Sequence, residues 1–144
     1  MLAFGTLPAT EEEPHSFPLL RREALEAERW NRLHADAKTP RIPLVSQILP
    51  PDGGPIVAAT DWLKALPDMV ARWLPEYYVS LGTDGFGRSG TREDLRALFE
   101  IDPPHIAAAT MVALARCGAL APAKAAKAVR DLGIDPDKID PAAL

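Results

Sequence analysis

The glycine-rich segment between residues 82 and 90 carries the pattern whose chemistry is easiest to name. Residues 85–90 read G-F-G-R-S-G, and a G-x-G-x-x-G sequence between a strand and a helix can bind the pyrophosphate of a dinucleotide. Such a site also needs a second strand and an acid about 20 residues further on, which binds the ribose. Residues 106–115 are instead an alanine-rich helical stretch without an acid. The sequence that follows the motif therefore argues against a dinucleotide-binding oxidoreductase.

The three histidines do not have the spacing of a metal site. His15, His34 and His105 are far apart, and no two of them share one helix at ligand spacing. His34 follows Trp30 by four residues, so packing is a better interpretation than catalysis. His105 falls in the first turn of an expected helix, where we expect a neutral surface histidine. No metal ligand is predicted.

The candidate nucleophiles lack partners in the sequence. Cys117 precedes a helix stop, and a catalytic thiol needs a histidine base, which no neighbouring residue supplies. We therefore expect a buried structural thiol at Cys117. Ser89 does not lie in a G-x-S-x-G turn. No residue of this chain is predicted to be catalytic.

A structural role suits the glycine-rich loop, Gly82–Gly90, better than a role in catalysis or dinucleotide binding. Asp84 and Arg88 could form an ion pair that fixes the loop, or they could line an interface, and the first interpretation is favoured. We expect Gly85 or Gly87 to adopt a positive φ, which other residues resist. The loop is then a rigid connection rather than a site of chemistry.

Composition narrows the class of protein. The chain has 144 residues, 47% hydrophobic and 25% charged, which is typical of one globular domain. Its net charge of −4 argues against nucleic-acid binding, which requires a basic face. No run of 18 apolar residues predicts a membrane span, and Met1–Glu13 does not resemble a secretory signal. A single cysteine excludes an internal disulfide and fits a reducing cytoplasm.

Strands and helices are expected to alternate, which predicts an α/β fold with parallel pairing. Ile56–Ala59 and Tyr77–Leu81 are apolar and should be buried strands, and Ile42–Leu49 should be a strand or an extended segment. Thr60 or Asp61 should cap a helix whose apolar stripe, including Trp62 and Trp73, runs to Leu74 with a kink or restart at Pro67. The other expected helices are Leu19–Leu33, Arg92–Phe99, Pro103–Cys117 and Pro122–Leu132.

Local signals set the ends of the later helices. Thr91 and Asp94 resemble a capping box, and Asp102 before Pro103 is a second start signal. Gly118 and Gly133 should end the two last helices in the left-handed conformation. The stretch 134–144 is expected to be irregular.

The nonapeptide Leu81–Ser89, LGTDGFGRS, resembles a segment of the homodimeric bacterial pyruvate dehydrogenases, the acetyl-transferring first component that depends on thiamine diphosphate. Gly54–Asp61, GPIVAATD, is similar to a strand of the same family. The resemblance covers residues 16–144. Shorter similar stretches are Leu20–Glu23, Trp30–His34, Pro40–Pro43, Thr91–Arg96, Phe99–Asp102 and Ile134–Lys138.

The resemblance implies a transketolase-type C-terminal domain, α/β with a short, mostly parallel sheet flanked by helices. It implies that residues 16–144 are a truncated form of that domain, and we expect residues 1–15 to be a poorly ordered tail. The family binds thiamine diphosphate and magnesium through a G-D-G motif and later paired asparagines. Here residues 82–85 read G-T-D-G and Asn31 is the only asparagine. We expect no cofactor on this chain alone.

The resemblance also implies a role and partners. The parent enzyme decarboxylates pyruvate and acetylates the lipoyl group of the dihydrolipoyl acetyltransferase. This chain would be a structural or assembly domain that packs with the remainder of the first component and its dimer mate in the cytoplasm. The alternative is a stand-alone interaction module that docks on a 2-oxo-acid dehydrogenase complex. The structural or interface candidates are Gly82, Asp84, Gly85, Phe86, Gly87, Arg88 and Ser89.

Because the resemblance implies missing neighbouring strands, we expect an unpaired sheet edge and uncovered apolar faces. The isolated chain should therefore be poorly stable or self-associate. Thermal melting of the purified chain tests the expected low stability, and titration with thiamine diphosphate and magnesium tests the expected absence of cofactor binding.

Overall fold

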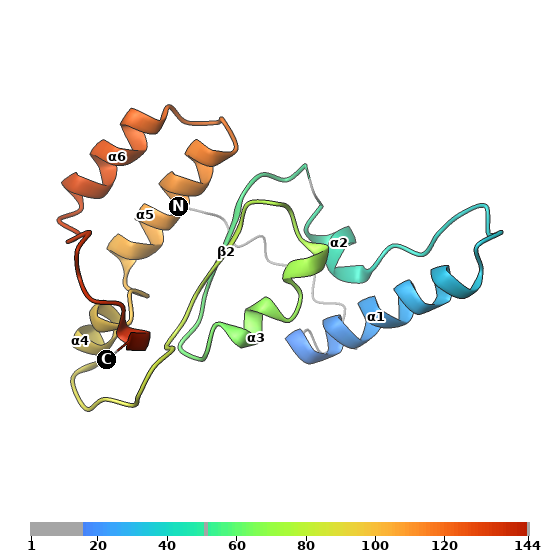
Figure 1. The fold of residues 1–144 in the computed structure, drawn as a ribbon, viewed down its shortest axis with the longest axis horizontal. Helices are drawn as coiled ribbons and strands as arrows, with labels where there is room; N and C mark the ends of the chain where they lie inside the picture. The colour runs from blue at the N-terminus through green and yellow to red at the C-terminus, as the bar shows by residue number, and fades with distance from the viewer. Residues whose placement is uncertain (1–15, 51, 144) are drawn as a thin grey trace.

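The computed structural model describes residues 16–50 and 52–143, so the predicted N-terminal tail lies outside the described residues. Two short strands run side by side through the middle of the molecule (Figure 1). The first three helices lie on one side of the strands and the last three on the other. The elements in chain order are α1 (Phe17–Leu33), α2 (Leu44–Ile48), β1 (Ile56–Ala59), α3 (Ala65–Asp68), the 3-10 helix η1 (Ala71–Trp73), β2 (Tyr78–Leu81), α4 (Arg92–Leu98), α5 (Pro103–Arg116), α6 (Pro122–Asp131) and the 3-10 helix η2 (Pro141–Ala143).

The sheet confirms the expected parallel pairing. Ile56 lies opposite Tyr78 and Ala59 opposite Leu81, with the intervening pairs in register. Helix α5 packs against both strands. The strands are half-buried rather than fully buried, because most of their residues keep partial solvent exposure in the described structure. The fold is a small α/β domain with a two-stranded parallel sheet and helices.

The apolar core cluster lies where α1, α2 and the segment before η1 meet. Ala24, Val45 and Val70 are each at most 2% exposed. Four partly buried side chains, two from α1 and two from the end of η1, pack around them: Phe17, Leu20, Trp73 and Leu74. Removing these apolar groups from water is the main favourable term for this side of the molecule.

The extended segment predicted over Ile42–Leu49 is wrong, because residues 44–48 form helix α2. The backbone N–H of Leu44 donates to the Glu23 carboxylate at 2.8 Å, and the Ser46 hydroxyl donates to the Trp73 carbonyl at 2.8 Å. Val45 fills the core cluster. These long-range contacts stabilise a single helical turn that an apolar run of this length does not specify.

The single apolar helix predicted up to Leu74 is also wrong. Helix α3 begins only at Ala65, with Lys64 at its N-cap, and η1 follows separately. Pro67 lies in the first turn of α3, as predicted, where its missing N–H is tolerated, but residues 60–64 are not helical, so the predicted cap at Thr60 or Asp61 is wrong and no earlier helix restarts here. Trp73 packs on the core as predicted, whereas Trp62 is 71% exposed.

The predicted ends of the last three helices are confirmed. The Thr91 hydroxyl accepts a hydrogen bond from the Asp94 N–H at 3.2 Å, and the Asp102 carboxylate accepts from the His105 N–H at 3.1 Å. Gly118 and Gly133 have φ values of +80° and +71°. Between α5 and α6 the buried residues are small alanines, which allow close approach of the helices.

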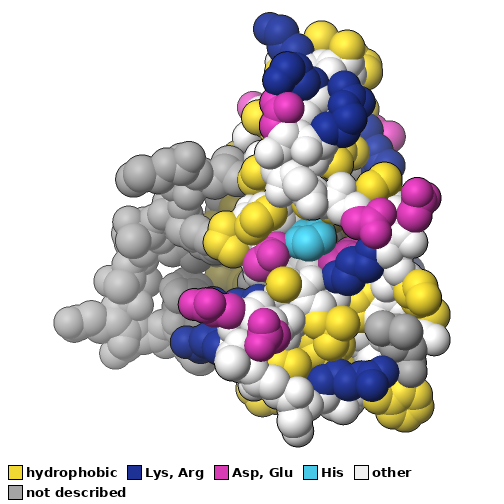
Figure 2. Space-filling view, turned by 90° about the vertical axis from the view of Figure 1, so that its left-hand side faces the viewer, with side chains coloured by type: hydrophobic (Ala, Val, Ile, Leu, Met, Phe, Trp, Pro, Cys, Tyr) yellow, Lys and Arg dark blue, Asp and Glu magenta, His cyan; other side chains and the backbone are white. Residues whose placement is uncertain are grey.

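The surface on the α4–α6 side is mixed in charge. Figure 2 shows basic and acidic side chains interspersed with apolar ones over this face. Among the residues that the structure describes, no helix combines the length and hydropathy needed to cross a bilayer.

Candidate functional site

The glycine-rich loop leaves β2 at the edge of the sheet where β1 also ends. Because the strands are parallel, the segments that follow Ala59 and Leu81 lie together at this edge. The Thr60 N–H donates to the Leu81 carbonyl at 3.0 Å, and the Thr83 N–H donates to the Trp62 carbonyl at 2.9 Å. The Thr83 hydroxyl also donates to a carbonyl of the segment after β1, at 3.2 Å. We call this contact between residues 60–64 and 82–85 the strand-end junction.

Asp84 is the side chain that fixes the junction. Its Oδ1 accepts the Lys64 backbone N–H at 3.0 Å, and its Oδ2 lies 3.6 Å from the Lys64 ammonium. The sequence suggests Arg88 as the ion-pair partner of Asp84, and the structure gives it Lys64. This contact also supplies a partner for an N–H at the start of α3, which explains where that helix begins.

Two glycines are required by close approach. A Cβ on Gly82 would lie 2.5 Å from the Trp62 carbonyl oxygen and 2.8 Å from the Lys64 nitrogen, both backbone atoms. Gly85 has φ +118°, which confirms the expected positive φ, and a Cβ there would lie 2.6 Å from the Pro141 carbonyl oxygen. Gly87 has open space around its Cα and no positive φ. The loop is thus closely packed at its beginning and open near its middle.

Asp61 links the junction to α4, a contact that the sequence prediction missed. The Arg96 guanidinium donates two hydrogen bonds to Oδ1 and one to Oδ2 of Asp61, at 3.0–3.3 Å, and Arg92 lies 3.8 Å from Oδ2. The hydrogen bond from Arg96, assisted by the charge of Arg92, holds the pKa of Asp61 below its usual value. The signal available in sequence was the spacing of the two arginines, four residues apart on one helix face.

A pocket of about 500 Å³ lies between the glycine-rich loop and α4. Its lining includes three arginines and one carboxylate, together with apolar residues from α4 and the segment after it. Phe86 is 77% exposed and contributes to the lining. The main lining residues are Asp61, Phe86, Arg88, Arg92, Leu95, Arg96, Phe99 and Ile101.

The loop therefore has a fixed base and an exposed tip. Phe86 and the next three residues are exposed, and Trp62 and Leu63 on the other side of the junction are 71% and 55% exposed. The structure brings Gly82, Asp84 and Gly85 together with residues 60–64. It leaves Phe86, Gly87, Arg88 and Ser89 at the surface.

The remaining candidates have structural environments. His105 is not the surface histidine expected, because its side chain is only 17% exposed and its Nδ1 contacts the Asp102 carboxylate that caps α5. Cys117 is half-buried rather than buried, and its Sγ donates to the Leu114 carbonyl at 3.3 Å. Within residues 16–50 and 52–143, no three His, Cys, Asp or Glu side chains are grouped to hold a metal ion.

Tyr78 presents a different kind of polar group. Its hydroxyl is buried and has no hydrogen-bond partner among the described residues. Burial, together with the charge of Asp68, raises the pKa of Tyr78 to about 12. Asp68 itself accepts a 2.6 Å hydrogen bond from Ser80 on the same strand as Tyr78.

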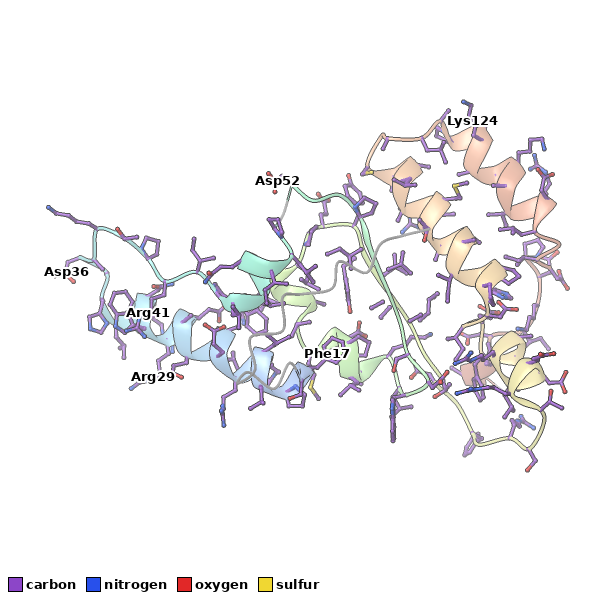
Figure 3. The ribbon with its side chains drawn as sticks, turned by 180° about the vertical axis from the view of Figure 1, so that it is seen from behind. Phe17, Arg29, Asp36, Arg41, Asp52 and Lys124 are labelled. Carbon is purple, nitrogen blue, oxygen red and sulfur yellow. The ribbon has the colours of Figure 1, made fainter. Side chains whose placement is uncertain are left out.

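The loop after α1 is fixed by stacking. The rings of Trp30 and His34 stack with centroids 4.3 Å apart, which confirms packing for His34, and Arg41 lies 4.4 Å from the tryptophan centroid. Asn31 exchanges two hydrogen bonds with the Arg41 backbone. Figure 3 shows Asp36 at the outer end of this loop and Arg41 returning beside α1.

Comparison with known proteins is consistent with this fold. Residues 17–102 match the family described as the transketolase-like TK C-terminal domain. Over 126–127 residues, or 88% of the chain, the sequence is 43% identical to the pyruvate dehydrogenase E1 component of Pseudomonas aeruginosa and of Cupriavidus necator. It is 40% identical to that of Escherichia coli over a similar stretch. The similarity is to the C-terminal part of these proteins, and the chain spans 14% of their length.

Proposed function

Because this chain belongs to the transketolase-like C-terminal domain family, we propose that it is an assembly domain of a pyruvate dehydrogenase E1-type enzyme. Its role is to support folding and subunit packing, not to carry out the reaction. One observation carries the proposal. The strand-end junction is fixed by backbone hydrogen bonds and close glycine contacts, yet Trp62, Leu63 and Phe86 beside it are 55–77% exposed.

Large exposed apolar side chains beside a rigid junction suit a protein interface. Aromatic residues are enriched in interface cores, and a fixed loop loses little conformational entropy when a partner binds. Among the described residues each strand also has a single neighbour in the sheet, which leaves one edge of each strand available for further pairing.

The residues present do not fit a thiamine diphosphate and magnesium site. The carboxylate of Asp84 in the G-T-D-G stretch already binds the Lys64 N–H and ammonium. The second carboxylate near the loop, Asp61, is bound by Arg96. We therefore place decarboxylation of pyruvate, which that cofactor makes possible, in the rest of the enzyme. The lipoyl group of the dihydrolipoyl acetyltransferase then receives the acetyl group, and we assign the assembly to the cytoplasm.

Reconstitution tests the assembly role. We would co-express the tagged chain with the Pseudomonas aeruginosa E1 component lacking its matching 127-residue region. We expect the two polypeptides to purify together and to recover pyruvate decarboxylation. The double variant Trp62→Ala/Phe86→Ala should weaken co-purification. Leu33→Ala/Ile42→Ala, a double truncation of apolar side chains that are each 59% exposed away from the junction, is the control.

Failure of the unsubstituted chain to purify with this polypeptide would contradict the assembly role. Binding instead to an intact 2-oxo-acid dehydrogenase complex would support the alternative of a stand-alone interaction module. An equal effect of the two variants would show that the exposed aromatic residues are not the contact.

A further inference from the structure

The pocket between the glycine-rich loop and α4 is lined by both charged and apolar side chains. Three of its lining residues are arginines and one is an aspartate, so basic residues outnumber acidic ones here, whereas the whole chain has a net charge of −4. The lining also includes Leu95, Phe99 and Ile101, and Arg92, Leu95, Arg96 and Phe99 recur at helical spacing, so cationic and apolar side chains alternate along one face of α4 and its C-cap. A ligand that matches both kinds of side chain carries negative charge and an apolar group together.

The arginines differ in their freedom to bind a ligand. Arg96 uses its Nε and one terminal nitrogen to bind Asp61 at 3.0–3.3 Å, which fixes its guanidinium at the pocket. Arg92 is 78% exposed, and its contact with Asp61 is 3.8 Å long. Such an exposed, long ion pair contributes little to stability, so Arg92 can turn to an added carboxylate at low cost. Guanidinium groups bind carboxylates with two parallel hydrogen bonds.

We propose that this pocket docks an acidic peptide segment that carries a large apolar side chain. The inference rests on the proposed function, because the segment would belong to the polypeptide with which this chain assembles. The carboxylates of the segment bind Arg92 at the rim, and the apolar side chain contacts Leu95 and Phe99. Phe86, exposed at the edge of the pocket, adds apolar contact area.

Peptide titration tests the pocket directly. The probe is a fluorescent octapeptide of alternating glutamate and leucine, and the comparison peptides replace glutamate with lysine or leucine with alanine. We expect saturable binding of the first peptide to the full 144-residue chain. Both comparison peptides should bind at least about tenfold more weakly, and added salt should weaken the charged contact.

A matched pair of charge reversals locates the site. Arg92→Glu should weaken binding at least about tenfold, because it removes the cation and repels the peptide. The variant should fold, since an acidic residue is favourable at the first position of a helix. Arg130→Glu makes the same charge change on the exposed surface of α6 and should alter affinity by less than about twofold.

Equal binding of the lysine peptide, or unchanged affinity in Arg92→Glu, would overturn the inference. Inorganic phosphate that competes as strongly as the unlabelled glutamate–leucine peptide would assign the pocket to small anions. That result would also overturn the inference. The reconstitution experiment tests the assembly role independently of the pocket. Peptide binding without co-purification would contradict the assembly role and leave the pocket assignment supported, and the converse would contradict the pocket assignment alone.

Discussion

The core cluster and the strand-end junction fix the chain by different means. In the core cluster, Ala24, Val45 and Val70 are buried by helices from separate parts of the sequence. At the junction, backbone and carboxylate hydrogen bonds connect residues 60–64 with 82–85, while Trp62 is 71% exposed. Apolar side chains are inside in the first region and outside in the second.

The difference separates what stabilises the domain from what it can offer to a partner. Burial of apolar surface contributes roughly 25 cal/mol per Å², so the core cluster contributes to stability without a partner. At the junction, hydrogen bonds set the backbone and leave apolar area free for another molecule. Substitutions in the two regions should therefore separate stability from assembly.

The largest effect is expected at Gly85. Gly85→Val forces a β-branched residue to φ +118° and places its Cβ 2.6 Å from the Pro141 carbonyl oxygen. We expect a loss of about 2–4 kcal/mol in the free energy of unfolding, from backbone strain and overpacking. Chemical denaturation measures it. Gly87→Val is the control, because that site is open and has no positive φ, and a similar loss there would contradict the assignment of the constraint to Gly85.

A direct comparison of the two regions is the second test. Val45→Ala removes two methyl groups from a side chain that is 2% exposed, and it should cost about 1.5–3 kcal/mol. Trp62→Ala should change the free energy of unfolding by less than about 0.5 kcal/mol, although it removes a larger side chain. Urea denaturation of both variants checks the pair. A larger loss for Trp62→Ala would show that the tryptophan is part of the core.

Tyr78→Phe should stabilise the isolated chain by about 1 kcal/mol, because it removes a buried hydroxyl without a described hydrogen-bond partner. The size of this effect also depends on pH, because the tyrosine form loses stability at high pH and the phenylalanine form does not. The folded pKa of about 12 lies above the ordinary value of 10.0, so this group's stability contribution is complete below pH 10 and is lost as the pH rises toward 12. Thermal melting of the tyrosine and phenylalanine forms between pH 8 and about pH 12 measures both effects.

If Tyr78→Phe lowers stability at neutral pH, the hydroxyl has a partner in the protein and the expectation is wrong. If the substitution stabilises the isolated chain but weakens reconstitution with the truncated E1 component, the hydroxyl matters for assembly as well as for stability.

The smallest effect is expected at Asp61. Its folded pKa is depressed, so the stability it contributes is present above the ordinary value of 3.8 and is lost as the pH falls through the lower folded value. The side chain is 52% exposed, so Asp61→Asn should cost less than about 1 kcal/mol at pH 7. Denaturation at pH 7 and below pH 4 checks this, and an effect that is unchanged between the two conditions would exclude the ion pair as its source.

Local chemistry in the sequence predicted the last three helices well. Their ends depend on Thr91, Asp102, Gly118 and Gly133, which act through their own side chains or backbone within a few residues. The parallel pairing of the strands and the positive φ at Gly85 were also correct. In each case the determining interaction lies within one turn or follows from the alternation of elements.

The errors have a common cause in long-range contacts. Helix α2 depends on Glu23 and Trp73, which are 21 and 27 residues away from the atoms they bind. The late start of α3 depends on Asp84, 20 residues further along the chain. Apolar periodicity predicted that Trp62 would be buried, but the hydrogen bond from Thr83 to its carbonyl keeps its backbone outside a helix.

The sequence by itself determined the family, the helix caps and the glycine-rich loop. It also showed that the G-x-G-x-x-G motif lacks the second strand and acid of a dinucleotide site. It did so because motifs and caps are read over a few neighbouring residues. Tertiary structure alone decided that Asp84 binds Lys64, that Asp61 binds Arg96, and that Trp62 faces solvent. These outcomes depend on parallel strands bringing their carboxyl ends to one edge of the sheet, where groups distant in sequence compete for the same hydrogen bonds.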